Sequence, residues 1–161
     1  MPLVESLLAA APPGPVVDVG LGGGAPGIPL AQVMPGQEFV LLEAERSKCE
    51  FLARWAPPNA RVAWGRAEEQ ELDWASLALA KALAQPPTAA EWCLPLVAPG
   101  GAVVLWVGPS AEPARVARVA ERLNAELAAA APSGFLVIRK HGPTPSGFPR
   151  RTGVAKKRPL A

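Results

Sequence analysis

A glycine-rich segment that directly follows a short apolar run is the feature that most constrains this chain. Residues 16–20 form the apolar run, and glycines follow at positions 20, 22, 23 and 24. Glycine permits positive φ and lets a ligand approach the backbone closely. Pro26 then favours a helix start, because proline suits a first helical turn. The pattern predicts a strand at 16–20, a ligand-binding turn and a helix over 26–34.

Apolar strands and helices alternate along the rest of the chain. We predict strands at 38–42, 61–64, 77–80, 102–107 and 135–139, and helices at 2–11, 47–55, 68–74, 88–97 and 112–129. This alternation predicts an α/β fold with a doubly wound, mostly parallel sheet and helices on both faces. Such sheets bind ligands at the carboxyl ends of their strands, which places residues 18–24, Glu43 and 66–68 on one rim.

The overall composition is that of one globular domain. The 161 residues are half apolar, and no apolar run approaches the roughly 20 residues of a membrane span. Residues 1–11 contain no Lys or Arg, which argues against a secretory signal. Cys49 and Cys93 lie far apart, without metal-type spacing. We therefore expect a cytoplasmic protein with reduced thiols, no metal and no membrane partner.

The glycine segment is compatible with two classes of ligand. Gly20, Gly22 and Ala25 match the spacing of a dinucleotide-binding turn, in which alanine is tolerated at the last position. Asp18 would lie near a bound pyrophosphate and repel it. S-adenosylmethionine has no phosphate and carries an ammonium and a sulfonium group, so an acidic rim suits it. The D-x-G-x-G-x-G arrangement that ends at Gly24 resembles the first motif of class I methyltransferases, of Rossmann-like fold, although a dinucleotide stays open.

Two further carboxylates fall on the predicted rim. Glu43 stands 23 residues beyond Gly20 at the end of the second strand, where a carboxylate can accept both ribose hydroxyls of either cofactor. Glu68 follows the third strand and could bond the adenine amino group. It could equally be a surface carboxylate in the first turn of a helix, favoured there by the helix dipole.

Basic charge is concentrated at the end of the chain. Residues 139–161 hold seven Lys and Arg residues and no acid, whereas the preceding 138 residues hold nine against fourteen Asp and Glu. Such a segment indicates a phosphate-rich partner or a solvated, disordered end. We divide the chain into a cofactor-binding domain, 1–140, and a basic C-terminal tail, 141–161.

Several segments in order along the chain resemble one family, the bacterial 16S ribosomal RNA guanine-N7 methyltransferases, also called the glucose-inhibited division protein B family. The first are Asp18-Val19-Gly20 and Ala25-Pro26-Gly27-Ile28-Pro29-Leu30. The last, and most specific, are Phe148-Pro149-Arg150-Arg151 and Lys156-Lys157-Arg158-Pro159-Leu160.

The resemblance implies a methyltransferase that uses S-adenosylmethionine to modify guanine N7 in small-subunit ribosomal RNA, naked or in a pre-assembled subunit. It implies cofactor contacts in the glycine segment and at the ends of the next strands. These are Gly20, Ala25, Ala67, Glu68 and Lys81. Together with Asp18, Gly22, Gly24 and Glu43, which the glycine segment and the strand ends already indicate, they make up the expected cofactor site. The basic end would contact RNA through Arg139, Lys140, Arg150, Arg151, Lys156, Lys157 and Arg158, with Phe148 able to stack on a base.

The chain also departs from this family. Family members usually carry some sixty more residues before the first strand. Lys81 stands where the family has arginine, and Val107 where it has a lysine. Two readings follow: an active enzyme, or a diverged relative that binds cofactor or RNA with little methyl transfer.

The expected chemistry needs few catalytic groups. Guanine N7 has a free lone pair, so alignment of N7, methyl carbon and sulfur can supply most of the catalysis. We assign no catalytic residue, apart from a possible role for Lys81. The base has to be unpaired or extruded to enter a pocket. We expect Trp55, Trp92 and Trp106 in the core rather than under a base, because they lie in apolar segments.

Overall fold

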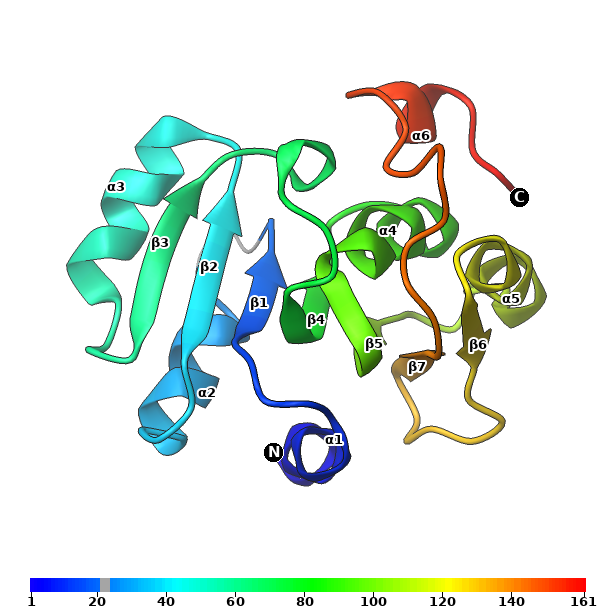
Figure 1. The fold of residues 1–161 in the computed structure, drawn as a ribbon. Coiled ribbons are helices and arrows are strands. Elements are labelled where there is room, and N and C mark those ends of the chain that lie inside the picture. The colour runs from blue at the N-terminus through cyan, green and yellow to red at the C-terminus, as the bar shows by residue number, and fades with distance from the viewer. Residues whose placement is uncertain (21–23) are drawn as a thin grey trace.

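A single twisted sheet organises the protein (Figure 1). The computed structural model describes residues 1–20 and 24–161, so the predicted contact at Gly22 lies outside the described residues. Within them the sheet has the strand order β3-β2-β1-β4-β5-β7-β6. The strands are β1 (Val16–Val19), β2 (Phe39–Glu43), β3 (Ala60–Trp64), β4 (Ala75–Lys81), β5 (Val97–Trp106), β6 (Ala125–Leu127) and β7 (Phe135–Lys140).

Strands β1 to β5 are parallel, and β7 runs antiparallel to both of its neighbours. All residues of β1 and β2 are buried, as expected for central parallel strands covered on both faces. The strand order reverses between β1 and β4. The predicted doubly wound, mostly parallel α/β fold is therefore confirmed.

Helices cover both faces of the sheet. Their bounds are α1 (Pro2–Ala10), α2 (Gly27–Val33), α3 (Arg46–Trp55), α4 (Pro86–Cys93), α5 (Pro113–Arg122) and α6 (Val154–Lys157), with 3-10 turns η1 (Ala67–Glu69) and η2 (Leu94–Leu96). On one face α1 packs through Val4 and Leu7, and α3 through Leu52. On the other, α4 and α5 pack through Cys93 and Val116.

The predicted helix over 112–129 is wrong in its second half. Helix α5 ends at Arg122, and Asn124 adopts a left-handed φ of 54° that a helix cannot continue through. The Asn124 side chain then donates to the carbonyl of Pro143, 2.8 Å away. Residues 125–127 form the edge strand β6, which pairs with β7. The conformation of this segment is therefore set by pairing with a strand that comes later in the chain, and not by its own helical propensity.

The predicted helix over 68–74 is also wrong, because only the turn η1 forms. Asp73 has a φ of 58°, and its N–H donates to the carbonyl of Pro95. Trp74 likewise donates to Leu96, so the chain runs directly into β4.

The basic tail packs against the domain instead of extending into solvent. In Figure 1 it crosses from β7 over α4, forms α6 near the top of the molecule and then turns back toward α5, where the chain ends. Its turn of helix α6 buries Ala155, and the Arg115 guanidinium donates to the carbonyl of Ala161 over 2.6 Å.

Three simpler features complete the fold. Cys49 and Cys93 are free thiols, and both are buried. Burial raises the pKa of the Cys49 and Cys93 thiols above its ordinary value. Within residues 1–20 and 24–161, no helix is long and apolar enough to cross a membrane, and no group of three or more His, Cys, Asp or Glu side chains could hold a metal ion.

Candidate functional site

A pocket of about 460 Å³ lies at the carboxyl ends of β1, β2 and β3, beside the point where the strand order reverses. This is where open α/β sheets bind their ligands. Its described lining combines backbone from the strand ends with charged side chains. The lining residues are Val19, Gly20, Leu42, Glu43, Ala44, Glu45, Lys48, Gly65, Arg66, Ala67, Glu68, Ala82, Leu83, Trp92 and Lys156.

Gly20 begins the glycine segment at the floor of this pocket. Its φ is 66°, and its N–H donates to the carbonyl of Leu42 over 2.8 Å. A Cβ at this position would overlap the Leu83 side chain. The left-handed φ therefore favours glycine here, and any larger residue would also displace the tip of the Leu83 side chain.

Glu43 ends β2 with its side chain almost fully buried, 5% exposed, on the pocket wall. One carboxylate oxygen, Oε2, accepts the N–H of Glu45 over 2.8 Å. This bond fixes the carboxylate at the strand end. The position is the one we predicted for a group that accepts ribose hydroxyls.

Glu68 and Ala67 line the pocket from η1, as we expected. Glu68 Oε2 accepts from the Arg66 guanidinium over 3.1 Å and from the N–H of Gly153 in the tail over 3.0 Å. Burial opposes ionisation of Glu68, but these donors and its own backbone N–H outweigh it, so its pKa lies below the ordinary value. Glu68 therefore joins the pocket to the tail.

Asp18 does not lie on the rim, so that prediction is wrong. Its side chain is fully buried within β1, where Oδ2 accepts the N–H of Gly27 at the start of α2 over 2.7 Å. A Cβ at Gly27 would come within 2.7 Å of the same oxygen, so glycine allows this approach. Burial raises the Asp18 pKa to about 7, against the lowering effect of the Gly27 bond. Asp18 therefore ties β1 to the start of α2.

Three other predicted cofactor residues do not line the pocket. Lys81 is exposed at the end of β4, opposite Trp106 of β5. Gly24 is buried against Ile28 and Leu52, and Ala25 is exposed beyond it. The residues that follow Lys81, Ala82 and Leu83, line the pocket instead.

Sequence reasoning missed Leu83, Trp92 and Lys48 as lining residues. Leu83 and Lys48 lie two and five residues beyond the ends of their strands. Inspecting several residues past every strand end would have found both. Trp92 is buried, as predicted, but it also borders the pocket from α4. Trp55 is 63% exposed, so its expected place in the core is wrong.

A second pocket of about 680 Å³ adjoins the first. The two share Ala82, Leu83, Trp92 and Lys156. A ligand in each would therefore border these same four residues. The remaining lining residues of the second pocket are Ala84, Gln85, Pro87, Thr88, Arg115 and Pro159.

Lys140 is not available to RNA, contrary to our prediction. Its side chain is fully buried, and Nζ donates to Asp73 over 2.5 Å, to Thr144 Oγ1 over 2.6 Å and to the carbonyl of Leu94 over 2.8 Å. Burial lowers the Lys140 pKa, although Asp73 opposes that shift. Lys140 ties the start of the tail to the segment before β4.

Arg150 also has a structural role instead of a free surface position. Its guanidinium bonds both oxygens of the buried Glu91 carboxylate, at 2.6 and 2.7 Å, and donates to the carbonyl of Arg158 over 2.8 Å. The Glu91 pair raises the Arg150 pKa. Phe148 is half-buried against the core, with the Arg122 guanidinium 6.0 Å from its ring centre, and its stacking on a base stays a prediction.

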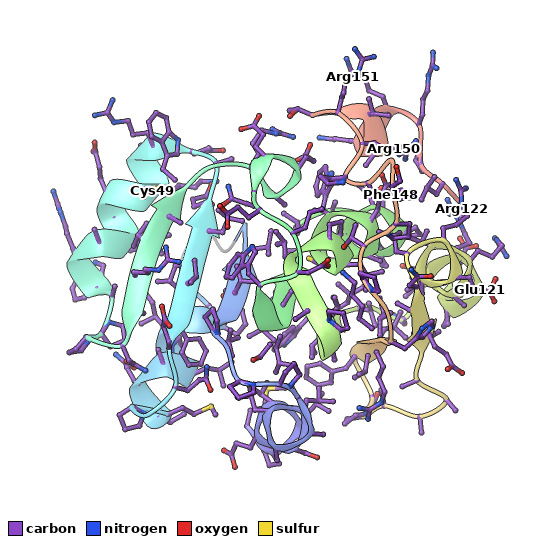
Figure 2. The ribbon with its side chains drawn as sticks, in the orientation of Figure 1. Cys49, Glu121, Arg122, Phe148, Arg150 and Arg151 are labelled. Atoms are coloured by element: carbon purple, nitrogen blue, oxygen red, sulfur yellow. The ribbon has the colours of Figure 1, made fainter. Side chains whose placement is uncertain are left out.

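Figure 2 shows Arg151 at the outer edge of the molecule, whereas Phe148 and Arg150 lie where the tail passes over α4 and α5. Five of the predicted RNA-binding cations are exposed. These are Arg139, Arg151, Lys156, Lys157 and Arg158. Four of them belong to the tail, and their contact with RNA stays a prediction.

The residues of the first pocket fit S-adenosylmethionine. The residues predicted to contact the ribose, Glu43, and the adenine, Ala67 and Glu68, all line this pocket. Gly20 lines the same pocket and has no side chain to obstruct the methionine part. When bound, this cofactor supplies an electrophilic methyl group.

Comparison with known proteins agrees with this geometry. A family description, GidB or rRNA small subunit methyltransferase G, matches residues 3–126. The ribosomal RNA small subunit methyltransferase G of Symbiobacterium thermophilum is 36% identical over an alignment that covers 90% of this chain and 69% of that protein. The protein of the same name from Rubrobacter xylanophilus is also 36% identical, and the alignment covers 98% of this chain and 68% of the relative.

Solved structures give the same fold. The antibiotic-resistance methyltransferase Kmr superposes with a TM-score of 0.66 at 16% identity, covering 86% of this chain and 91% of that one. A TehB-like SAM-dependent methyltransferase from Corynebacterium glutamicum gives 0.62 at 22% identity, with 86% and 85% covered. The fold is that of class I methyltransferases. The chain belongs to the rRNA small subunit methyltransferase G family, and is an S-adenosylmethionine-dependent methyltransferase that acts on small-subunit ribosomal RNA.

Proposed function

We propose that the protein methylates N7 of a guanine in small-subunit ribosomal RNA, and that it does so in the cytoplasm. The observation that carries this proposal is the lining of the second pocket. Its described residues include no Asp, Glu or His, the side chains that most often act as a general base. An exocyclic amine or a hydroxyl has to lose a proton when it is methylated. Guanine N7 attacks with its free lone pair and loses none.

The charges balance without any added group. The bond from the methyl carbon to sulfur breaks as the bond to N7 forms, so sulfur becomes a neutral thioether and the base gains the positive charge. The protein then has to align the two reactants and exclude water, for which effective molarities of about 10⁵ M and above are known in well-oriented systems. Leu83 and Trp92, shared by both pockets, stand where that alignment takes place.

The family departures do not favour a relative without methyl transfer. Lys81 is exposed, and the lining of the two pockets includes neither Lys81 nor Val107. Neither residue occupies the boundary where the reactants would meet. Val107 does line a third pocket, which shares five residues with the second, so the two replacements lie beside the described site and not in its lining.

The experiment is methyl transfer from labelled S-adenosylmethionine to small-subunit RNA that lacks the modification, both as naked RNA and as assembled subunits. The RNA is digested to nucleosides and separated. Label in 7-methylguanosine is the expected result. Label in another nucleoside would refute the proposal, and cofactor binding without transfer would favour a non-catalytic relative.

A further inference from the structure

Trp64, the last residue of β3, holds an exposed aromatic ring beside the first pocket. The residue is 64% exposed and is not among the residues that line the first or the second pocket. Its indole N–H donates to the carbonyl of Ala44 over 3.0 Å, and the Arg46 guanidinium lies 5.4 Å from the ring centre. These two contacts fix the orientation of the ring, although most of its surface is open to solvent. A ring held in place outside the core is suited to contact a partner.

We propose that Trp64 and Arg46 form a stacking platform for an unpaired base of the RNA substrate. This inference rests on ribosomal RNA as the substrate, and not on which atom of the target base is methylated. Proteins recognise single-stranded RNA by stacking its bases on aromatic rings and guanidinium planes, and the platform presents both. Because every base has a face that can stack, the platform holds RNA without selecting its sequence.

The place of the platform in the sheet decides which part of the RNA it contacts. In the strand order β3-β2-β1-β4, three strand spacings separate Trp64 from Ala82 and Leu83, which follow β4 and line both pockets. At about 4.8 Å for each spacing this is about 14 Å, more than the width of one base. The base on Trp64 is therefore a neighbour of the target nucleotide and not the target itself.

The side chains around the ring favour a polyanion as the partner. The Arg46 side chain is 74% exposed, and its ion pair with Glu50 is long, 3.9 Å. Lys48, on the same turn of α3, is 47% exposed in its side chain and pairs with Glu45 over 3.3 Å. Exposed ion pairs of this kind contribute little to stability, so a phosphate can replace either carboxylate. Two solvent-exposed cations beside an aromatic ring fit the alternation of phosphates and bases in single-stranded RNA.

The exposed cations of the tail continue this surface across the mouth of the first pocket. Lys156 lines the pocket from α6, and Lys48 lines it from α3. In the view of Figure 1 the end of β3 and α6 lie on either side of η1. RNA that contacts both Trp64 and the tail therefore passes over the pocket at the ends of the strands.

The test compares the affinity of three variants for unmodified small-subunit RNA. Trp64→Leu removes the ring and is expected to weaken binding about five- to hundredfold, the range for loss of one stacked base. Trp64→Phe keeps an aromatic face and is expected to restore most of that loss. Trp55→Leu is the matched control, because Trp55 is 63% exposed but lies at the other end of α3, and it is expected to leave the affinity unchanged.

Two further measurements separate stacking from other effects. The slope of log K against log salt is expected to be the same in Trp64→Leu as in the native protein, because stacking releases no counterions. The affinity for S-adenosylhomocysteine is also expected to stay the same, because Trp64 does not line the first pocket. RNA is expected to quench the tryptophan fluorescence of the native protein more than that of Trp64→Phe.

Equal RNA affinity of the native protein and Trp64→Leu would overturn the platform, as would a loss that Trp64→Phe fails to restore. A native dimer in sedimentation that Trp64→Leu abolishes would also overturn it, since the ring would then contact a second copy of the chain. Should Trp64→Leu fail to fold, the difference in quenching between the native protein and Trp64→Phe decides, and equal quenching refutes stacking. Failure of the platform leaves the expected label in 7-methylguanosine in place, whereas label in another nucleoside would refute N7 methylation and leave the platform.

Discussion

The bidentate pair between Arg150 and Glu91 gives the sharpest prediction about the tail. Glu91 is 3% exposed in its side chain and Arg150 is 22% exposed. Arg150→Ala leaves the Glu91 carboxylate buried without its cation. Breaking a buried pair in this way costs about 3–5 kcal/mol. We take the low end, about 3 kcal/mol, because Arg150 is partly solvated in the native protein.

For a chain of this length a change of 1 kcal/mol moves Tm by about 2–4 °C, so Arg150→Ala is expected to lower Tm by roughly 6–12 °C. Differential scanning calorimetry measures this directly. Arg151→Ala is the matched control, because Arg151 adjoins Arg150 in the chain but is exposed. Changes at exposed positions usually alter stability by no more than about 0.5 kcal/mol.

A double variant tests the cause of the loss. Replacing the pair by apolar residues, with Arg150→Met and Glu91→Leu together, removes the unpaired carboxylate. Such replacements are often neutral or stabilising by about 1–4 kcal/mol, so the double variant is expected to be more stable than Arg150→Ala. If Arg150→Ala and Arg151→Ala lower Tm equally, or by less than about 2 °C, the tail is not anchored as described.

Four further predictions concern the buried charges, the tail and the glycine turn. The pKa of Asp18, raised to about 7, means that the folded state keeps a proton between about pH 4 and 7 that the unfolded state has lost, so stability falls as pH rises through this window. Asp18→Asn is expected to remove up to about 4 kcal/mol of this pH-dependent change in the free energy of unfolding. Urea unfolding at several pH values measures it, and the same pH dependence as in the native protein would contradict the prediction. Lys140→Met is expected to cost about 2–4 kcal/mol in unfolding experiments by leaving buried acceptors unpaired, without changing the salt dependence of RNA binding. Lys157→Ala with Arg158→Ala is expected to leave Tm unchanged and to reduce the slope of log K against log salt by about 0.7–0.9 for each lost phosphate contact, and an unchanged slope would refute contact. Gly20→Ala places a side chain in left-handed backbone at a cost of about 1–2 kcal/mol, so Tm in differential scanning calorimetry is expected to fall by about 2–8 °C, and an unchanged Tm would contradict the left-handed conformation.

The sequence predicted the strands of the sheet better than its edges. The buried strands β1 and β2 are mostly apolar, apart from Asp18 in β1 and Glu43 at the end of β2, and a local pattern identifies them. The edge strand β6 depends on pairing with β7 and on the backbone of Asn124, and no local pattern shows this. Its three residues therefore resembled the end of helix α5.

The positions of ionisable side chains were harder to predict from the sequence than those of apolar ones. Glu43 was placed correctly, because the end of a parallel strand fixes the rim. Asp18, Lys140 and Arg150 are also ionisable, yet each is turned inward: Asp18 to the N–H of Gly27, and the two cations to carboxylates 67 and 59 residues away. Composition alone treats every cation of the tail as equal. Only the tertiary contacts separate the cations that anchor the tail from those that face solvent.

The most direct test of the account is calorimetry of S-adenosylmethionine and S-adenosylhomocysteine binding to the native protein and to Glu43→Leu. We predict saturable binding of both by the native protein, no binding of NAD, and a loss of about tenfold or more in Glu43→Leu, as expected when bonds from ribose hydroxyls to a carboxylate are removed. Unchanged affinity in a folded Glu43→Leu protein, or binding of NAD in place of S-adenosylmethionine, would contradict the assignment of the pocket at the ends of β1, β2 and β3.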